Sequence, residues 1–331
     1  MKYDDKQFAR GFFESLETGD PLGYLIDTAP AMLGSNLSRQ EKLNHLLFMS
    51  QLVQNTGTAK YGVAKLARKV ERVRRVTSRW LPSAHTLGTF VDVGCGAHDP
   101  VALSAYMYGM GFSRGLGVDL APLRNPAYSA LSMLNILATL QIMPEKYVAE
   151  DMDRSVFLAR MSGFDVARFA ASDFFGGIRP MKGKVDYIND DVVNSGLVEG
   201  EASVIASFAV FEHVADVPGV LKFLHTRTVP GGIGIHFIDL RDHRVYRKTA
   251  DYDEFSFLTT EISPKNLNRL RCSQMIDAFE DAGFIVLDTV KRRKPLPPGT
   301  RNQLLEQFAC MSDEDLETVA LFLVTKRPIS S

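Results

Sequence analysis

The sequence is poor in cysteine and has no long hydrophobic run. Its 331 residues include three cysteines, Cys95, Cys272 and Cys310, and no Cys-x-x-Cys pair. An odd number of widely spaced cysteines excludes a disulfide framework and a zinc knuckle, and it favours a reducing compartment. No apolar run approaches the roughly 20 residues that span a bilayer. The N-terminal residues carry acids and no apolar signal-peptide core. We therefore expect a cytoplasmic protein without a membrane span.

The sequence also lacks an excess of charge of either sign. It has 38 Lys and Arg against 39 Asp and Glu, for a formal net charge of -1 at pH 7. A near-neutral chain gives no global electrostatic reason to bind nucleic acid or an acidic partner. Basic residues gather only in Lys65–Arg75 and Lys291–Lys294, and such runs more often form a solvated face than an anion site. We expect no nucleic-acid partner.

Hydrophobic residues make up 45% of the chain, enough for one large domain with additions or for two domains. Through residues 1–85 the apolar side chains recur at three- and four-residue spacings, as at Phe8, Phe12 and Leu16, which predicts an N-terminal helical cap. Beyond residue 85 short apolar runs alternate with helical stretches. We therefore predict a second domain over residues 86–331.

Within this second domain the order of segments predicts a mostly parallel sheet. Helical stretches such as Val217–Arg227 and Cys272–Ala282 separate most of the apolar runs, as in right-handed βαβ units. No long crossover separates the last two strands, so they are expected to pair antiparallel. Residues 122–183 form a predicted helical insertion, and loops of this size are usually functional. The predicted strands are Thr89–Val93, Gly115–Val118, Val185–Asn189, Ala202–Phe208, Ile233–Ile238, Ile285–Val290 and Thr318–Thr325.

The sharpest local signal is the turn that follows the first predicted strand, in Phe90–Gly96 (FVDVGCG). Its glycines allow the backbone to approach a ligand at the carboxyl end of the strand. A dinucleotide would need a third glycine where this chain has Asp99, and an acid there would repel a pyrophosphate. A sulfonium nucleoside instead carries positive groups. Asp92 would face its ammonium, and Asp119, after the second strand, would accept hydrogen bonds from both ribose hydroxyls.

These segments, in this order, resemble class I S-adenosylmethionine-dependent methyltransferases. Val91–Gly96 looks like their first motif and Gly117–Asp119 like the acid that follows it. Ser207–Val214 resembles the exit of the fourth strand in a subgroup that includes ubiquinone- and sugar-modifying enzymes, and Thr228–Gly232 resembles the proline–glycine turn before strand five. The resemblance covers about residues 88–327. It implies an α/β fold with a seven-stranded Rossmann-like sheet, mostly parallel with an antiparallel last strand.

The resemblance also implies S-adenosyl-L-methionine as the cofactor and assigns residues to it. Asp191 is the residue expected at the adenine amino group, because its spacing to Glu212 fits. The segment from Asp119 to Asp191 is longer than the family usually shows, which leaves Asp173 as a rival. The residues assigned to the cofactor are Asp92, Gly94, Cys95, Gly96, Asp119, Leu120, Asp191, Val192, Ser207 and Phe208.

Methyl transfer needs alignment of the acceptor and sometimes removal of a proton. His213 follows the fourth strand, and histidine suits base work near neutrality. The alternative is that Glu212 and His213 only begin the next helix. His243 is a second candidate base, in a cluster over His236–Arg244 that would equally suit an acceptor clamp, a metal site or a structural loop network. Relatives with a metal at the Glu-His motif usually carry another Glu where this chain has Ala209, so no metal is expected.

The predicted function is methyl transfer to an oxygen, or as second choice a nitrogen, of a small molecule such as a saccharide or specialised metabolite. Runs similar to Asp239–His243 occur in methyltransferases associated with bacterial surface polysaccharides and natural products. The alternatives are a nicotinamide-dependent oxidoreductase, a non-catalytic binding or scaffold protein on the same fold, and an RNA methyltransferase. For the last of these the chain lacks an Asn/Asp-Pro-Pro-Tyr-like motif. The sequence does not indicate an oligomeric state.

Overall fold

The computed structural model describes Glu14, Ser38 and residues 63–81, 87–142, 144–148, 152–247, 252–261 and 267–329. The predicted helical cap over residues 1–85 lies outside these ranges, apart from the two single residues and α4 (Val63–Trp80). Among the described helices, none combines the length and apolar character needed to cross a membrane.

The seven strands follow the order β3-β2-β1-β4-β5-β7-β6. The pairs β1–β4, β2–β3 and β4–β5 are parallel, whereas β7 is antiparallel to both β5 and β6. The predicted fold class is therefore confirmed. In chain order the strands are β1 (Thr89–Val93), β2 (Arg114–Val118), β3 (Val185–Ile188), β4 (Ala202–Phe208), β5 (Thr228–Asp239), β6 (Ile285–Arg293) and β7 (Thr318–Lys326).

The chain divides into two compact units. The first comprises Met1–Arg74 and Cys95–Asp190, and the second comprises Arg75–Gly94 and Asp191–Ser331. Strands β2 and β3 belong to the first unit, and the other five strands belong to the second.

In the first unit the close packing of a helix on β2 depends on two glycines. A Cβ atom on Gly115 would lie 2.1 Å from the carbonyl oxygen of Ser104, and one on Gly117 would lie 2.2 Å from that of Pro100. Both carbonyls belong to the segment that begins and forms α5 (Ala102–Gly109). Backbone atoms cannot move away as a flexible side chain can. The helix therefore lies directly on the strand only because these two positions carry no side chain.

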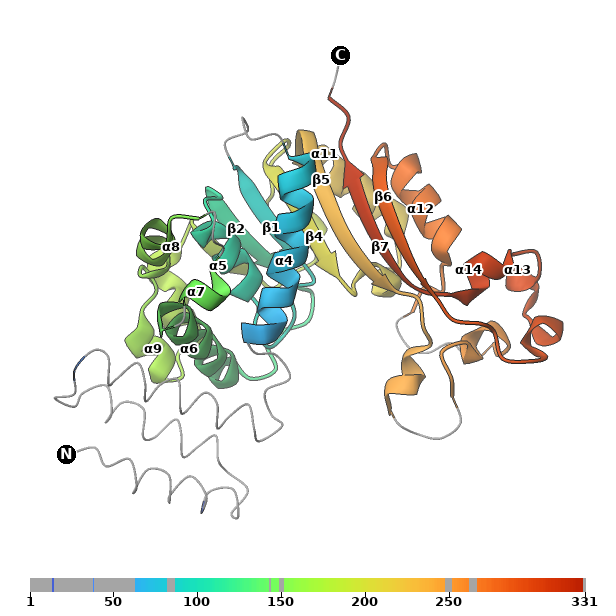
Figure 1. The fold of residues 1–331 in the computed structure, drawn as a ribbon, viewed down its shortest axis with the longest axis horizontal. Helices are drawn as coiled ribbons and strands as arrows, with labels where there is room; N and C mark the ends of the chain where they lie inside the picture. Colours follow the sequence, from blue (N-terminus) through green and yellow to red (C-terminus); the bar gives the residue numbers. More distant parts are fainter. Residues whose placement is uncertain are drawn as a thin grey trace. The chain divides into compact units, whose positions relative to one another are not determined.

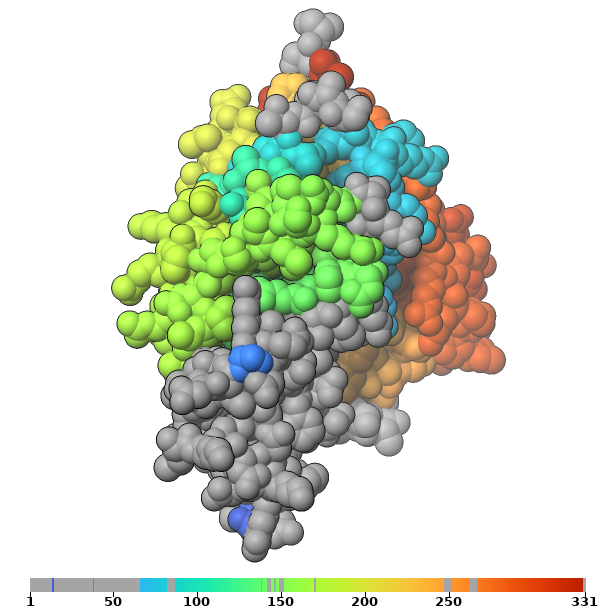
Figure 2. All heavy atoms as spheres, turned by 60° about the vertical axis from the view of Figure 1, so that its left-hand side comes forward, coloured from blue at the N-terminus to red at the C-terminus, as the bar shows by residue number. Residues whose placement is uncertain are grey.

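The segment between β2 and β3 folds into short helices, each begun by a local signal. Asp153, Asp165 and Asp173 accept hydrogen bonds from backbone N–H groups at the first turns of α8, α9 and α10, as N-cap acids do. The outer side chains of this segment are coloured green in Figure 2. Its helices are α6 (Pro126–Ile142), α7 (Pro144–Tyr147), α8 (Arg154–Met161), α9 (Val166–Ala170), α10 (Phe174–Ile178) and η1 (Arg179–Met181).

In the second unit the central strands are buried throughout, as expected for parallel strands covered on both faces. Every residue of β1 and the first six residues of β4 are buried. Helix α12 (Cys272–Asp281) packs on β6 and β7, and α11 (Val217–Arg227) packs on α12 (Figure 1). Both helices lie within one residue of their predicted bounds.

The start of β5 differs from the sequence prediction. The Pro-Gly-Gly segment was expected to form a turn before a strand beginning at Ile233, but the strand begins at Thr228. Thr228 pairs with Ala202, and Ile233 pairs with Val204. An advance of five residues along β5 therefore corresponds to an advance of only two along β4. The extra residues form a β-bulge. The proline of this segment can therefore lie in the strand, because at a bulge it does not need an N–H to bond to the neighbouring strand.

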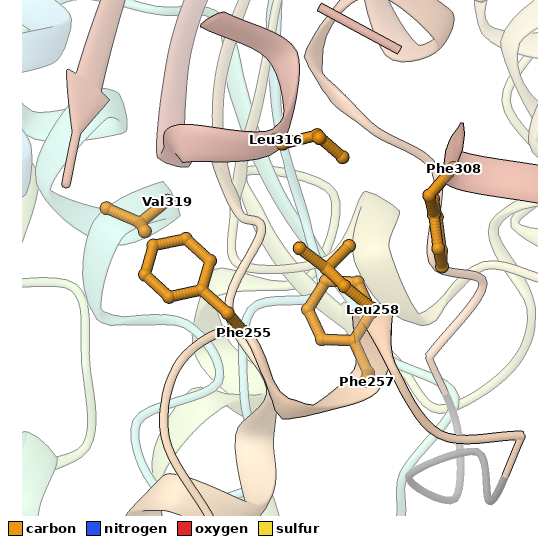
Figure 3. Close-up of a cluster of buried hydrophobic side chains, with 6 residues drawn as sticks. All are labelled: Phe255, Phe257, Leu258, Phe308, Leu316 and Val319. Atoms are coloured by element: carbon orange, nitrogen blue, oxygen red, sulfur yellow. The ribbon is translucent and has the colours of Figure 1, made fainter. Parts of the chain in front are cut away.

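A separate hydrophobic cluster in the second unit lies beside the end of β5. Its side chains come from the segment after β5, from α13 (Glu306–Ala309) and α14 (Asp313–Glu317), and from β7. Figure 3 shows these side chains converging. The cluster consists of Phe255, Phe257, Leu258, Phe308, Leu316 and Val319, all 4% exposed or less.

Arg271, at the start of α12, joins this cluster to β5. Its guanidinium donates to the carbonyl of Leu240 at 2.7 Å, just beyond β5, and to those of Asp315, Leu316 and Thr318 at 2.6–3.0 Å. The side chain is 1% exposed. Burial lowers its pKa to about 10, so it stays charged at neutral pH. One buried cation therefore satisfies four backbone carbonyls from two distant segments.

Replacing Arg271 with Leu should lower the free energy of unfolding by about 3 kcal/mol or more, because four buried carbonyls lose a charged donor. Urea unfolding measures the change. The matched control is Arg292→Leu on the exposed side of β6, expected within about 0.5 kcal/mol of the wild type. Equal unfolding midpoints for the two variants would contradict the role given to Arg271.

Candidate functional site

In the first unit the carboxylate of Asp119 closes the glycine turn. Its Oδ2 accepts a hydrogen bond from the N–H of Gly96 at 2.7 Å, and its Oδ1 accepts one from Ala121 at 2.8 Å. The side-chain amide of Asn189 donates to the carbonyls of Asp119 and Leu120. Each carboxylate oxygen has a second lone pair, so Asp119 is fixed in place and can still accept from a ligand.

The turn leaves open space above Gly96. Gly96 has φ +97°, and no described atom lies within 4 Å of the position that its Cβ would occupy. Cys95 is buried, and its Sγ lies 3.2 Å from the Cβ position of Gly117. The cysteine therefore packs against β2, and a ligand can approach the backbone at Gly96.

In the second unit the carboxyl ends of β1, β4 and β5 lie in register. Val93 pairs with Ser207, which pairs with His236. The Ser207 hydroxyl lies 2.8 Å from Nδ1 of His236, and burial lowers the pKa of His236 to about 3. The Ser207 side chain is thus engaged in the core, so a ligand contact from this residue would come from its backbone. Asp92 is also buried, at 2% exposed.

Ala209 turns the chain out of β4 through a left-handed backbone conformation. Its φ is +61°, which costs a non-glycine residue about 1–3 kcal/mol. Its N–H donates to the carbonyl of Phe237 at 2.7 Å. The turn η3 (Phe211–His213) follows, and Asn268 holds it by donating to the carbonyls of Phe211, Glu212 and Val214. This arrangement fixes the direction in which Glu212 and His213 leave the sheet.

Three side chains meet at this edge of the second unit. One ligand-type atom each from Glu212, His213 and His243 lies within 4.8 Å of the others, and the two imidazole centroids are 4.9 Å apart. The two histidines predicted as candidate bases are therefore neighbours. Burial lowers the pKa of His243, which favours its neutral, proton-accepting form.

Glu212 is buried at 3% exposed. Its Oε1 accepts a hydrogen bond from the N–H of Asp239 at 3.3 Å, and its Oε2 has no partner among the described residues. Burial raises the pKa of Glu212 to about 8, and the nearby charge of Asp239 adds to the shift. A carboxylate in this position is unstable by itself and favours either a proton or a cation.

Asp239, by contrast, is fully paired. Arg241 binds it through Nε and Nη2 at 2.8 and 2.7 Å, and the Tyr246 hydroxyl donates to it at 2.5 Å. Burial alone would raise the pKa of Asp239, but these hydrogen bonds outweigh it and hold the pKa below its usual value. The pair of Asp239 and Arg241 therefore adds little net charge to the cluster.

Asp173 and Asp191, the two acids that the sequence analysis considers for an adenine contact, both cap short helices. Asp173 accepts from the N–H of Gly176 at 2.8 Å, twelve residues before β3 begins. Asp191 accepts from the N–H of Val193 at 3.1 Å, three residues after β3 ends. Ligands of open α/β sheets bind beyond the carboxyl ends of the strands. The position in the chain therefore favours Asp191 over Asp173.

The structure brings together the two histidines predicted as candidate bases, and it shows two supporting groups that sequence reasoning missed. Asn268 gives no local signal, since its partners lie more than fifty residues away. The pairing of Asp239 with Arg241 and Tyr246 could have been predicted, because the Asp-Leu-Arg-Asp-His run is polar and begins at the end of β5.

The two basic runs form ordinary solvated faces. In α4 the apolar side chains of Leu66, Val70, Val73 and Val76 are buried on one face, and charged residues occupy the other. On β6, Lys291 pairs with Glu314 at 2.9 Å and Arg293 with Glu317 at 2.6 Å. Two of the four basic residues of Lys291–Lys294 therefore have acidic partners within the chain.

Residues 65–289 match the family model described as a methyltransferase domain. A comparison with curated protein sequences finds no match. Solved structures similar to the chain include an S-adenosylmethionine-dependent methyltransferase from Mesorhizobium loti, 13% identical, with a TM-score of 0.39 over 77% of this chain and 98% of that one.

Two further similar structures have equally low scores. One is the geranyl diphosphate C-methyltransferase of Streptomyces coelicolor A3(2) with Mg²⁺, geranyl diphosphate and S-adenosylhomocysteine, 13% identical, with a TM-score of 0.40 over 90% and 87% of the two chains. The other is a complex of the Haloferax volcanii Trm112 activator with a methyltransferase, 15% identical, with a TM-score of 0.39 over 81% and 95%. These likenesses are too distant to carry an argument, so assignment to a family depends on the family model.

Glu212→Gln should remove a pH-dependent loss of stability. Between pH 4.5 and about 8 the folded wild type keeps a proton that the unfolded chain has lost, so its stability falls as the pH rises through this window. One unit of pKa shift corresponds to about 1.4 kcal/mol. The variant should therefore be more stable than the wild type by roughly a few kcal/mol near pH 9, and by little near pH 4.5.

Urea unfolding at the two pH values, in buffer free of divalent cations, measures this difference. Glu280→Gln on the exposed face of α12 is the control, for which no pH-dependent difference is expected. A gap between Glu212→Gln and wild type that is equal at both pH values would contradict the burial argument.

Proposed function

Because the chain belongs to the methyltransferase-domain family, as the match over residues 65–289 shows, we propose that it is a class I S-adenosylmethionine-dependent enzyme that methylates an oxygen of a small molecule. Nitrogen is the second choice of acceptor atom, and a saccharide or specialised metabolite is the proposed acceptor class. The observation that carries this proposal is the neighbouring pair of imidazoles, His213 and His243. Imidazole accepts protons near neutral pH, and a hydroxyl group must lose its proton when it is methylated.

The residues of the first unit fit the proposed cofactor. Asp119 is held by two backbone N–H groups and keeps lone pairs for ribose hydroxyls. The open space at Gly96 would be filled by any side chain. Leu120, next to Asp119, is 72% exposed and offers an apolar surface to a base. The assignments of Cys95, Asp92, Gly94, Asp191, Val192, Ser207 and Phe208 to the cofactor stay predictions.

The cofactor supplies a methyl group already activated by the sulfonium, so the protein's task is to orient the acceptor and manage one proton. Orientation can contribute about 7–11 kcal/mol to lowering the barrier. The exposed His213 is the group proposed to meet the acceptor, with the half-buried His243 beside it. The Asp239–Arg241–Tyr246 contacts fix the loop that carries His243.

Calorimetric titration with S-adenosylhomocysteine tests the cofactor assignment. We expect saturable binding, with no binding of NAD, and a loss of at least tenfold in affinity for Asp119→Ala, because the variant loses the ribose acceptor and the hydrogen bond to Gly96. Asp281→Ala, an exposed acid at the end of α12, is the control and should bind as the wild type does. A folded wild-type protein that ignores S-adenosylhomocysteine would overturn the proposal.

Turnover separates an enzyme from a scaffold protein of the same fold. Release of S-adenosylhomocysteine is measured with a panel of saccharides and hydroxylated metabolites. With an acceptor found, His213→Gln should lower kcat by about 10²–10⁴-fold, the usual contribution of proton transfer, while the affinity for S-adenosylhomocysteine stays unchanged. A variant with full kcat would remove His213 from the reaction. His225→Gln is the control, since His225 packs against Phe284, and it should keep the kcat of the wild type.

A further inference from the structure

We propose that Glu212, His213 and His243 form a binding site for a divalent transition-metal ion. Glu212 and His213 come from the turn after β4, and His243 comes from the loop after β5. One oxygen and two nitrogens from these residues all lie within 4.8 Å of one another. The three groups thus converge from two separate segments, both held by their own hydrogen bonds.

The spacing is slightly wider than that of a loaded site. Metal–nitrogen and metal–oxygen bonds of about 2.0–2.2 Å in tetrahedral geometry put ligand atoms roughly 3.4 Å apart. Rotation of the exposed His213 and of the partly exposed His243 closes the difference. Glu212 is the fixed member, because it is 3% exposed and tied to the N–H of Asp239.

Two buried atoms of the cluster lack hydrogen-bond partners. They are Oε2 of Glu212 and Nε2 of His243, both shielded from solvent within the described part of the chain. Nε2 of His243 lies 3.7 Å from a carboxylate oxygen of Asp239, which is too long for a hydrogen bond. Burying polar atoms in this way costs free energy unless a partner is supplied. A bound cation is a partner for both atoms at once.

The local charge also suits a cation. The bidentate contact with Arg241 offsets the charge of Asp239 only in part, since that charge still acts on Glu212. The guanidinium of Arg241 in turn donates its hydrogen bonds to Asp239 rather than to the three proposed ligands. Glu212 has no ion-pair partner among the described residues. The deprotonated carboxylate is therefore the uncompensated charge of the cluster, and a dication meets one negative ligand and two neutral ones.

The ligand set indicates which ions bind. Mg²⁺ and Ca²⁺ prefer all-oxygen ligands, whereas imidazole suits Zn²⁺, Fe²⁺, Co²⁺ and Ni²⁺. Two imidazoles and one carboxylate therefore favour a first-row transition ion or zinc. Three protein ligands leave further coordination positions for water or for an oxygen of a small molecule.

Metal binding does not depend on the proposed function, but its use in catalysis does. A hydroxyl group bound to such an ion has a lowered pKa and loses its proton to water more easily. With an ion bound, His213 and His243 would be its ligands, and the ion would take over the proton-removing role that the proposed function gives to these imidazoles in the metal-free protein. The oxygen then forms its bond to the methyl carbon as the bond from that carbon to sulfur breaks, and S-adenosylhomocysteine leaves.

Cobalt and zinc titrations test the site. Chelator-treated full-length protein is titrated with Co²⁺, followed by visible absorption, and with Zn²⁺, followed by calorimetry. We expect one ion per chain and at least tenfold weaker binding for Glu212→Gln and for His243→Gln. His225→Gln is the control, since His225 packs against Phe284 away from the cluster, and it should bind as the wild type does.

A measurement on the wild-type protein tests the site even if the variants fail to fold. In the Co²⁺-loaded wild type, ring N–H protons of two ligating histidines should give paramagnetically shifted proton resonances. The absence of saturable binding, unchanged binding by both ligand variants, or a lack of shifted imidazole signals would overturn the site. Titration with S-adenosylhomocysteine in chelator separates the two proposals: cofactor binding without metal binding defeats only the metal site, and the reverse defeats only the proposed function.

Discussion

The second unit depends on one buried cation. Arg271 gives up most of its contact with water to bind four backbone carbonyls, three around the end of α14 and one just beyond β5. These segments are about seventy-five residues apart in the chain (Leu240 and Asp315), and they meet where the β5–β7 ladder ends, at the pairing of Asp239 with Ala320. A guanidinium suits this role because its planar fork carries five donors and stays protonated when buried.

The position of this cation matters for the candidate site. Leu240, whose carbonyl it binds, lies between Asp239 and Arg241. The three residues Asp239–Arg241 therefore both bind Arg271, through the carbonyl of Leu240, and contain the Asp239–Arg241 ion pair that supports His243. Asn268 fixes the turn that carries Glu212 and His213. Both supports come from the few residues that lead into α12. This segment links the packing of the C-terminal elements to the geometry of the three proposed ligands.

Much of the fold was predictable because its signals are local. The strands Thr89–Val93 and Ala202–Phe208 have the bounds that their apolar runs indicate, as does the helix Val217–Arg227. The start of β5 was not predictable in the same way, because proline and two glycines usually end a strand, and only the pairing of Thr228 with Ala202 brings them into the sheet. The candidate bases were found from their place after strands. Arg271 and Asn268 were not, because their partners are backbone atoms far away in the sequence.

The left-handed conformation of Ala209 restricts which residues that position can accept. Valine, isoleucine or threonine would add a branched Cβ to a backbone that already disfavours an unbranched one, whereas glycine, asparagine and aspartate tolerate it. Ala209 is exposed, so its freedom to vary is limited by a torsion angle rather than by packing. In a mutational scan the position would therefore resemble a glycine of a tight turn more than a surface alanine. Its neighbours in the Glu-His turn keep their directions only while that angle is held.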